Sequence, residues 1–166
     1  MSKFEKVSFE QWKKDSGFDG VPESMLREWY DKIKLPHQAT KASAGCDFCM
    51  PFNLNFEAGS TFRIASGIRW VCKEADQDKV LLIMPRSGLG FKYGIRLSNT
   101  VGVIDADYCN SDNEGHIIIS VVNPSNQDIE LEQGKPFAQG IIVKYEVPEG
   151  AESDAERNGG FGSTDK

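Results

Sequence analysis

Residues 116–122 read HIIISVV, a nearly unbroken run of β-branched side chains, and this composition is typical of a β-strand. Four further runs carry the same signature, and clusters of turn residues such as 123–126 (NPSN) and 132–134 (EQG) separate them. Many short strands with no helical pattern between them predict an all-β, antiparallel sandwich, jelly roll or barrel. The further runs are 62–72 (FRIASGIRWVC), 79–84 (KVLLIM), 127–131 (QDIEL) and 137–145 (FAQGIIVKY).

The first 35 residues have a helical pattern instead. Ser8 and Gln11 have the spacing of a capping box, and Gly17 is a typical helix stop. Val7 and Trp12 are spaced as a hydrophobic staple around this cap. A second helix is expected to begin at Pro22 and to pack one apolar face against the main domain. That face consists of Met25, Leu26, Trp29 and Ile33.

The C-terminal residues differ from both preceding parts. Residues 148–156 are acidic and polar, and residues 157–164 (RNGGFGST) are rich in glycine around one phenylalanine. Glycine gives the backbone high conformational freedom, so we expect a flexible arm that closes on a flat ligand. The chain is therefore divided into a helical extension (1–35), a β core (36–147) and a Gly-rich arm (148–166).

Composition excludes several classes of function. The chain has 166 residues, and 19 Lys and Arg against 25 Asp and Glu give a net charge of −6. Such a protein is a poor non-specific binder of nucleic acid, so a phosphate ligand must meet a local cationic site or arrive neutralised by a metal. No apolar run approaches the ~20 residues that cross a bilayer. The first residues lack a secretory signal and the four cysteines are expected to be reduced, which predicts a cytoplasmic protein.

Three segments combine turn residues with reactive side chains. Residues 44–48 (AGCDF) place a carboxylate in a small-residue turn, and residues 84–90 (MPRSGLG) leave a strand and bend sharply. In the second segment an arginine fork, a serine hydroxyl and a glycine suit an anion. Residues 99–108 (NTVGVIDADY) are expected to form a bent β-hairpin that carries an amide, two carboxylates and a phenol.

None of the common phosphate or metal signatures is present. The glycine-rich tail lacks Gly-Lys-Ser/Thr, and Gly88, Gly90 and Gly94 miss the G-x-G-x-x-G spacing. Cys46 and Cys49 form a lone C-x-x-C without the second pair that a structural zinc needs. Ser87 lies outside a G-x-S-x-G elbow, so a serine-hydrolase triad is not supported either.

Taken together, these segments resemble the five ordered motifs of the trimeric deoxyuridine triphosphatases (dUTP diphosphatases). The resemblance runs from about residue 33 to the C-terminus. Motifs two, three and five in this order carry it, whereas motifs one and four are weaker. The motifs correspond to residues 44–48, 85–92, 99–108, 134–139 and 159–164.

The resemblance implies a distorted β jelly roll that assembles as a homotrimer with shared active sites. It implies hydrolysis of dUTP to dUMP and pyrophosphate with Mg²⁺, which lowers dUTP and supplies dUMP for thymidylate synthesis. Asp105 would hold and activate the attacking water at the α-phosphorus, mainly by orienting it. Tyr108 would pack on the deoxyribose and exclude a 2′-hydroxyl. The uracil edge would pair with Asn99, Gly102, Val103 and Ile104.

The same resemblance assigns the phosphate contacts. Arg86, Ser87 and Gly88 would hold the triphosphate with Gln139 nearby, and Asp47 would contact Mg²⁺ through its water shell. The arm would supply a stacking phenylalanine and donors for the terminal phosphate. These arm residues are Arg157, Phe161, Gly162, Ser163 and Thr164.

Some features depart from the family pattern. Arg157 precedes Phe161 by four residues where five is usual, and residues 136–139 (PFAQ) keep only the end of motif four. Residues 109–115 (CNSDNEG) form an extended loop after Tyr108, and the N-terminal helices have no assigned role. Two alternatives remain: a dCTP deaminase of the same fold, and a non-catalytic regulator that binds dUTP.

Overall fold

The computed structural model describes residues 1–153 and 155. Three antiparallel sheets have the strand orders β1-β5-β9-β7, β10-β4 and β2-β3-β11-β6-β8. In chain order the elements are β1 (Lys3–Lys6), α1 (Phe9–Ser16), α2 (Glu23–Asp31), β2 (His37–Gln38), β3 (Cys46–Cys49), β4 (Leu54–Phe56), β5 (Thr61–Val71), η1 (Glu74–Asp76), β6 (Lys79–Pro85), α3 (Ser87–Tyr93), β7 (Arg96–Leu97), β8 (Gly102–Ile104), η2 (Ala106–Asn110), β9 (His116–Val122), β10 (Ile129–Leu131) and β11 (Pro136–Lys144).

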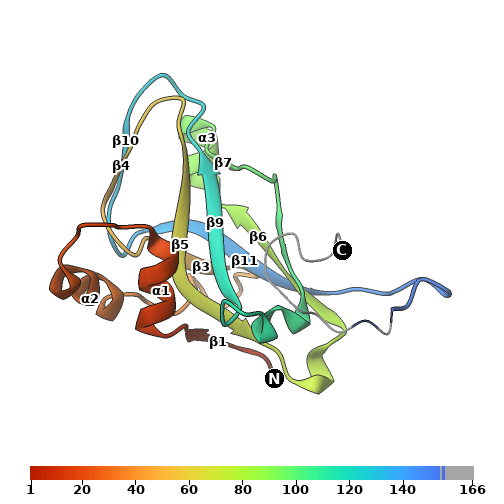
Figure 1. Cartoon of the computed structure of the whole chain (residues 1–166). Helices are drawn as coiled ribbons and strands as arrows, with labels where there is room; N and C mark the ends of the chain where they lie inside the picture. The colour runs from red at the N-terminus through yellow and green to blue at the C-terminus, as the bar shows by residue number, and fades with distance from the viewer. Residues whose placement is uncertain (154, 156–166) are drawn as a thin grey trace.

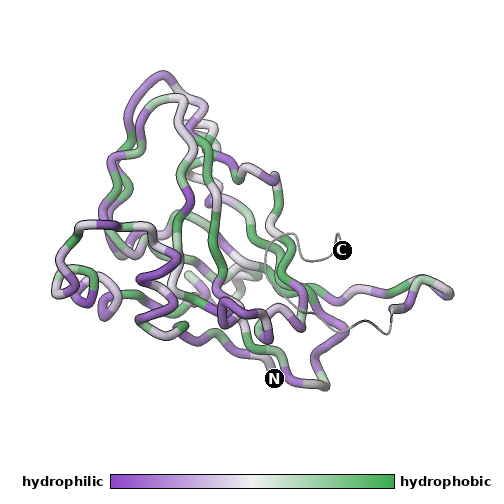
Figure 2. Tube along the Cα trace, viewed as in Figure 1, coloured by the Kyte–Doolittle hydropathy of each residue, from purple (hydrophilic) through white to green (hydrophobic). Residues whose placement is uncertain are grey.

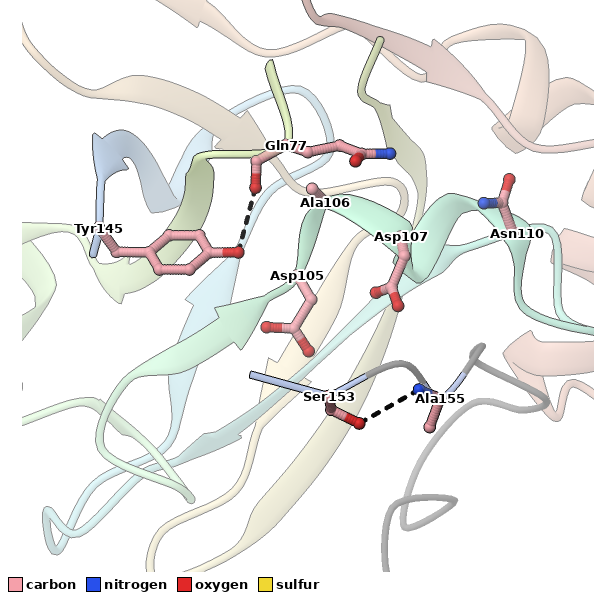
Figure 3. Close-up of a pocket in the computed structure, with 8 residues that line it drawn as sticks. All are labelled: Gln77, Asp105, Ala106, Asp107, Asn110, Tyr145, Ser153 and Ala155. Atoms are coloured by element: carbon pink, nitrogen blue, oxygen red, sulfur yellow. Dashed lines mark hydrogen bonds between the residues drawn. The ribbon is translucent and has the colours of Figure 1, made fainter. Parts of the chain in front are cut away.

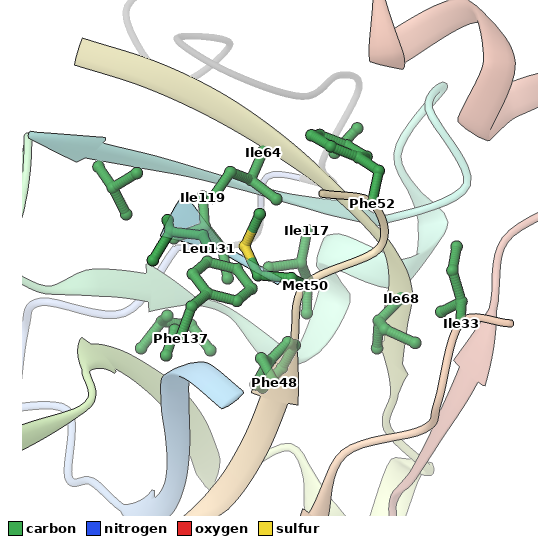
Figure 4. Close-up of a cluster of buried hydrophobic side chains, with 14 of the residues drawn as sticks. Ile33, Phe48, Met50, Phe52, Ile64, Ile68, Ile117, Ile119, Leu131 and Phe137 are labelled. Carbon is green, nitrogen blue, oxygen red and sulfur yellow. The ribbon is translucent and has the colours of Figure 1, made fainter. Parts of the chain in front are cut away.

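The two larger sheets enclose one hydrophobic core. In Figure 1, β5 and β9 run side by side with β6 and β11 behind them, α1 lies beside β5, and α2 lies beside α1. Strand β9 alternates as expected, because Ile117, Ile119 and Val121 are buried while the residues between them are partly exposed. The apolar segments in Figure 2 follow these strands. Figure 4 shows Phe48 and Phe137 packing beside the β9 isoleucines.

All five expected strands are present, as β5, β6, β9, β10 and β11, with ends shifted by at most two residues. The all-β prediction is confirmed. The predicted hairpin over 99–108 is only partly correct, because the strand ends at Ile104 and the 3₁₀ helix η2 follows. The sharp bend after Pro85 is the short helix α3.

The N-terminal segment contains one element that the helical pattern does not reveal. Strand β1 pairs antiparallel with β5 and extends the four-stranded sheet at its edge. Helix α1 begins and ends where predicted, with the Ser8 hydroxyl accepting from the Gln11 N–H and Gly17 in the left-handed conformation. The face predicted for α2 is partly wrong, since Met25 is 44% exposed whereas Leu26 is buried.

A bulge in β5 brings the N-terminal segment close to the core. The pairing of β5 with β9 shifts between Ala65 and Arg69, and Gly67 within this bulge has φ +75°. A Cβ on Gly67 would lie 2.4 Å from Ile33 Cδ1, so a glycine is needed for this close packing. The Trp12 indole N–H donates to the Ala65 carbonyl over 2.9 Å, which fixes α1 on the strand.

His116 is fully buried between α1 and the β5 bulge. Its Nδ1 lies 2.6 Å from an Asp15 carboxylate oxygen, and its Nε2 accepts from the Gly67 N–H over 2.8 Å. Burial lowers the pKa of His116, although the Asp15 carboxylate partly opposes this shift. Protonation of Nε2 would also place two donors face to face, so the folded protein favours the neutral ring.

This histidine makes stability depend on pH. The pKa of His116 is lower in the folded state than in the unfolded chain. Its contribution to the free energy of unfolding is therefore fully present above about pH 6.5 and is lost as the pH falls below that value. The expected loss is at most about 1.4 kcal/mol per pH unit. Urea unfolding at several pH values measures it. The matched variant His116→Gln keeps an acceptor for Gly67 but does not titrate, so an equal decline in both proteins would contradict the assignment.

No helix among the described residues combines the length and apolar composition that crossing a bilayer requires.

Candidate active site

A tight turn between β7 and β8 positions the central part of the site. The Thr100 N–H donates to the Leu97 carbonyl over 3.1 Å, and Thr100 has φ +66°. Gly102 then lies opposite Ile83 of β6, where a Cβ would be 3.1 Å from the Ile83 Cβ. The absence of a side chain at Gly102 lets β8 lie close against β6. Asp105 follows β8 directly, in extended conformation, and caps η2.

Asp105 faces a cavity of about 760 Å³. Figure 3 shows the carboxylates of Asp105 and Asp107 on the same side of η2, both directed toward the segment with Ser153 and Ala155. The Tyr145 hydroxyl donates to the Gln77 carbonyl over 3.1 Å at the rim. The lining residues are Gln77, Asp105, Ala106, Asp107, Asn110, Tyr145, Ser153 and Ala155. An exposed carboxylate beside such a space can accept a hydrogen bond from water and orient it toward a ligand.

A second cavity of about 420 Å³ is lined by residues of β8 and β9. It contains all four residues expected to recognise the base, which are Asn99, Gly102, Val103 and Ile104. Residues 117–120 of β9 and Arg63 of β5 complete its wall. Val103 is 59% exposed, so its side chain is accessible at this cavity. The grouping of these residues agrees with the prediction, and their contact with a base stays a prediction.

The residues expected at the phosphates form a separate group. Strand β11 lies between β3 and β6, so Gln139 pairs with both Asp47 and Met84. The Asp47 carboxylate is buried and makes an ion pair with Arg86, whose Nη1 donates to Oδ2. Gln139 donates to the Pro85 carbonyl over 3.3 Å. Three predicted residues from distant parts of the chain therefore meet here.

Ser87 and Gly88 begin α3 next to this group. Both residues are exposed, and a Cβ on Gly88 would meet no atom within 4 Å. The expected positions for phosphate contacts are therefore accessible. Arg86 has five N–H donors, so its ion pair with Asp47 does not use its full capacity.

One chain does not bring these two groups together. Ile104 pairs with Leu81, which places Asp105 beside Val80 at one end of β6. Arg86 follows the opposite end of the same strand, six residues further along (86 − 80 = 6). At about 3.3 Å per residue, ~20 Å of strand separates the two levels. The backbone positions of Asp105 and Arg86 therefore lie far apart within one chain.

A family model for dUTPase matches residues 31–165. The chain belongs to the dUTPase family. The deoxyuridine 5'-triphosphate nucleotidohydrolase of Thiobacillus denitrificans is 38% identical over 138 residues, which are 79% of this chain and 90% of the relative. A crystal structure of dUTPase from Streptococcus mutans is 28% identical with a TM-score of 0.66, and the alignment covers 89% of this chain and 99% of that one.

More distant dUTPases share the fold alone. The dUTPase of phage phi11 of S. aureus is 16% identical with a TM-score of 0.64, over 93% of this chain and 97% of the phage chain, and its D-to-N mutant structure shows the coordination of a structural Mg(II) ion. The part of this dUTPase-family chain that precedes residue 31 contains β1, α1 and nearly all of α2, and it lies outside the family match.

Tyr108 is buried and does not line either of the two cavities described above. Its hydroxyl donates to the His116 carbonyl over 3.1 Å and accepts from the Asn113 amide over 3.0 Å. Its contact with deoxyribose therefore stays a prediction for this dUTPase. The predicted residues Arg157, Phe161, Gly162, Ser163 and Thr164 lie outside the described residues.

Several residues that line the cavities were not predicted from sequence. Gln77 and Tyr145 line the cavity of about 760 Å³ beside Asp105, and Arg63 lines the cavity of about 420 Å³ beside β8. Each lies remote in sequence from the hairpin, so no local motif identifies it.

Burial raises the pKa of the Cys46 and Cys49 thiols, which favours their interpretation as small packed residues in this dUTPase.

Proposed function

We propose that the protein hydrolyses dUTP to dUMP and pyrophosphate, with Asp105 as the residue that holds the attacking water. Membership of the dUTPase family supports this proposal. The observation that carries it is the position of Asp105 at the start of η2, beside one cavity and one residue away from another. A base in the smaller cavity would leave the sugar and α-phosphate near the Asp105 carboxylate.

The base would be recognised by the hairpin between β7 and β8. The Asn99 amide and the backbone groups near Gly102 and Ile104 offer donors and acceptors to the uracil edge. Apolar side chains such as Ile83, Leu97 and Ile119 contribute to the walls of this cavity, and we expect them to exclude the 5-methyl group of thymine by steric contact. Asp105 would orient the water for in-line attack at the α-phosphorus and accept its proton as the new bond forms.

The triphosphate would contact Arg86, Ser87, Gly88 and Gln139. Fixed donors at these positions stabilise the charge that develops on the leaving pyrophosphate. The donor set near Asp47 suits an indirect magnesium contact, because one carboxylate oxygen is already engaged by Arg86. Within the described residues no group of three or more His, Cys, Asp or Glu side chains is arranged to hold a metal directly.

Mg²⁺ therefore fits as an ion carried by the substrate phosphates, with Asp47 contacting its water shell. When bound, it would neutralise phosphate charge and so allow this acidic chain to accept a triphosphate. Arg86 would be held in position by Asp47 for the same phosphates.

The active site would be shared between copies of the chain, as in a homotrimer. The ~20 Å of strand between the levels of Asp105 and Arg86 supports this, because both must reach one nucleotide. One copy would supply Asp105 and the base cavity, and a neighbour would supply Arg86. Arg157, Phe161, Gly162 and Ser163 would come from the arm of a third copy.

The decisive assay mixes the protein and Mg²⁺ with dUTP, UTP, dCTP or dTTP and follows pyrophosphate and ammonia. We expect pyrophosphate from dUTP and far less from the other nucleotides. Ammonia from dCTP would instead identify a deaminase. Tight binding of dUTP with neither product would identify a regulator without catalytic activity.

Removal of residues 159–166 tests the role of the arm. We expect a loss of activity of about 10-fold or more, because the stacking of Phe161 on a base is worth about 1–3 kcal/mol. The thermal unfolding temperature should not change, since the residues of the described core all precede the truncation in sequence. The matched variant Phe161→Ala in the full chain separates stacking from the other arm contacts. Full activity after truncation would remove the arm from the mechanism.

A further inference from the structure

The N-terminal helix α1 and the loop 109–115 contact each other directly, although about a hundred residues separate them. The Glu114 carboxylate accepts from the Ser8 N–H over 2.8 Å and from the Ser8 hydroxyl over 2.6 Å. The same hydroxyl accepts from the Gln11 N–H and caps α1. One carboxylate therefore joins the first turn of the helix to the tip of the loop.

A second connection lies at the end of the loop. The His116 ring is held between Asp15 of α1 and the Gly67 N–H of the β5 bulge. Asp15 also accepts from the Gln11 side chain over 2.8 Å. Because His116 begins β9, the point where the loop enters the strand is fixed relative to α1.

The inner side of the loop holds Tyr108. The Asn113 amide donates to the Tyr108 hydroxyl over 3.0 Å and to the His116 carbonyl over 3.3 Å, while its oxygen accepts from the Gly115 N–H. The Tyr108 hydroxyl itself donates to the His116 carbonyl. Asn113 thus joins η2, which carries Tyr108 and begins after Asp105, to the loop that α1 holds.

The backbone of the loop is closed tightly. Glu114 has φ +58°, an uncommon conformation for a residue other than glycine, and Gly115 follows with φ +71°. A Cβ on Gly115 would lie 2.5 Å from Cys109 Cα, so the two ends of the loop touch. A conformation of this kind persists where surrounding contacts hold it, and Ser8 supplies two such contacts.

We propose that Ser8, Asp15, Asn113, Glu114 and His116 form a clamp that positions η2, and that through it the N-terminal segment sets the preference of the enzyme for a deoxyribose nucleotide. The inference rests on the proposed function and on the expectation, drawn from the sequence resemblance, that Tyr108 packs on the sugar. Asn113 is a positioning residue: it acts on the nucleotide through Tyr108. A ring held at its hydroxyl cannot move aside to admit a 2′-hydroxyl.

Two features that the family pattern leaves unassigned gain a common role in this way. The sequence pattern predicts that the loop 109–115 is extended relative to the family, and β1 and α1 precede the residues that the family model matches. Each of them depends on the other for its hydrogen bonds. Because the loop is hydrogen-bonded to Tyr108 of η2, we expect these two features to change the rigidity of the site more than its chemistry.

The test measures kcat/KM for dUTP and for UTP with Asn113→Ala. We expect the ratio of the two values to fall on the order of tenfold, because a small displacement of a positioning group has large effects on rate. A merely structural role would lower the active fraction for both substrates and leave the ratio unchanged, and that result would overturn the proposal. Tyr108→Phe, which keeps the ring and removes the hydroxyl, serves as the second variant and is expected to lower the ratio likewise.

The N-terminal half of the clamp has its own variant, Ser8→Ala with Glu114→Gln. This double variant should also lower the ratio of kcat/KM for dUTP to kcat/KM for UTP. An unchanged ratio would overturn the role given to the N-terminal segment. The control is Asp112→Ala, an exposed neighbour in the same loop, which should keep the wild-type ratio. A wild-type protein that does not prefer dUTP would contradict the proposed function itself.

Discussion

Asp105→Asn is expected to lower the rate of pyrophosphate release from dUTP by about 10³-fold while leaving nucleotide affinity nearly unchanged. The amide keeps the shape and one acceptor oxygen of the carboxylate but does not take up a proton from water. Asp105 lies at the surface of a cavity rather than in the core, so the fold should tolerate the substitution. Pyrophosphate release gives the rate, and calorimetry with a non-hydrolysable dUTP analogue gives the affinity.

Asp112→Asn provides a matched control, since Asp112 is an exposed aspartate in the loop that follows η2. This variant should retain the wild-type rate. If Asp105→Asn turned over dUTP at a similar rate, water activation would have to be assigned to another residue. Asp107, which faces the same cavity, would then be the first to test.

A mixture of two inactive variants is expected to regain activity. Asp105→Asn lacks the group that holds water, and Arg86→Ala lacks a group that holds phosphate. If each site takes Asp105 from one copy and Arg86 from a neighbour, some mixed assemblies contain intact sites. For random assembly from equal amounts, about one quarter of the sites are intact, so about one quarter of the wild-type rate should return. The two variants are unfolded together in urea, refolded, and assayed with dUTP.

The control mixture combines Asp47→Ala with Arg86→Ala, whose substituted side chains form one ion pair within a single chain. These two substitutions affect the same part of each site, so no activity should return. A lack of recovery in the first mixture, with each variant folded and assembled, would mean that one chain supplies both groups. That result would contradict the inference that the distance between Asp105 and Arg86 along β6 requires the active site to be shared between copies of the chain.

The parts of the fold that follow from local chemistry were predicted correctly. Ser8 and Gly17 bound α1 as expected, because capping depends on residues a few positions apart. Strand β9 has the predicted bounds, because its run of β-branched residues is a local signal. Strand β1 was missed because KFEK offers only one apolar residue, and its pairing with β5 is a long-range contact. Helix α3 contains Gly88 and Gly90, which are poor helix formers, so the sequence predicted only a bend.

In the candidate site, too, the features that depend on neighbouring residues were predicted, whereas those that depend on long-range contacts were not. The hairpin residues Asn99 to Ile104 are neighbours in sequence, and their grouping around one cavity was predicted. The meeting of Asp47, Arg86 and Gln139 depends on the register of β11 between two strands, which no motif spacing specifies. The contacts of α1 with the loop 109–115 have no sequence signal, because hydrogen bonds across a hundred residues leave no periodic pattern.

Strand β1 has a consequence for the behaviour of the chain in solution. It covers the backbone of β5 at residues 68–71, and three of its four residues, Lys3, Glu5 and Lys6, are charged. A chain shortened to begin at residue 31 would expose the backbone edge of β5 at residues 68–71, which could then pair with another molecule. We expect the shortened protein to aggregate as its concentration rises, which light scattering would detect. The first residues thus keep the molecule from recruiting copies of itself into extended intermolecular sheets.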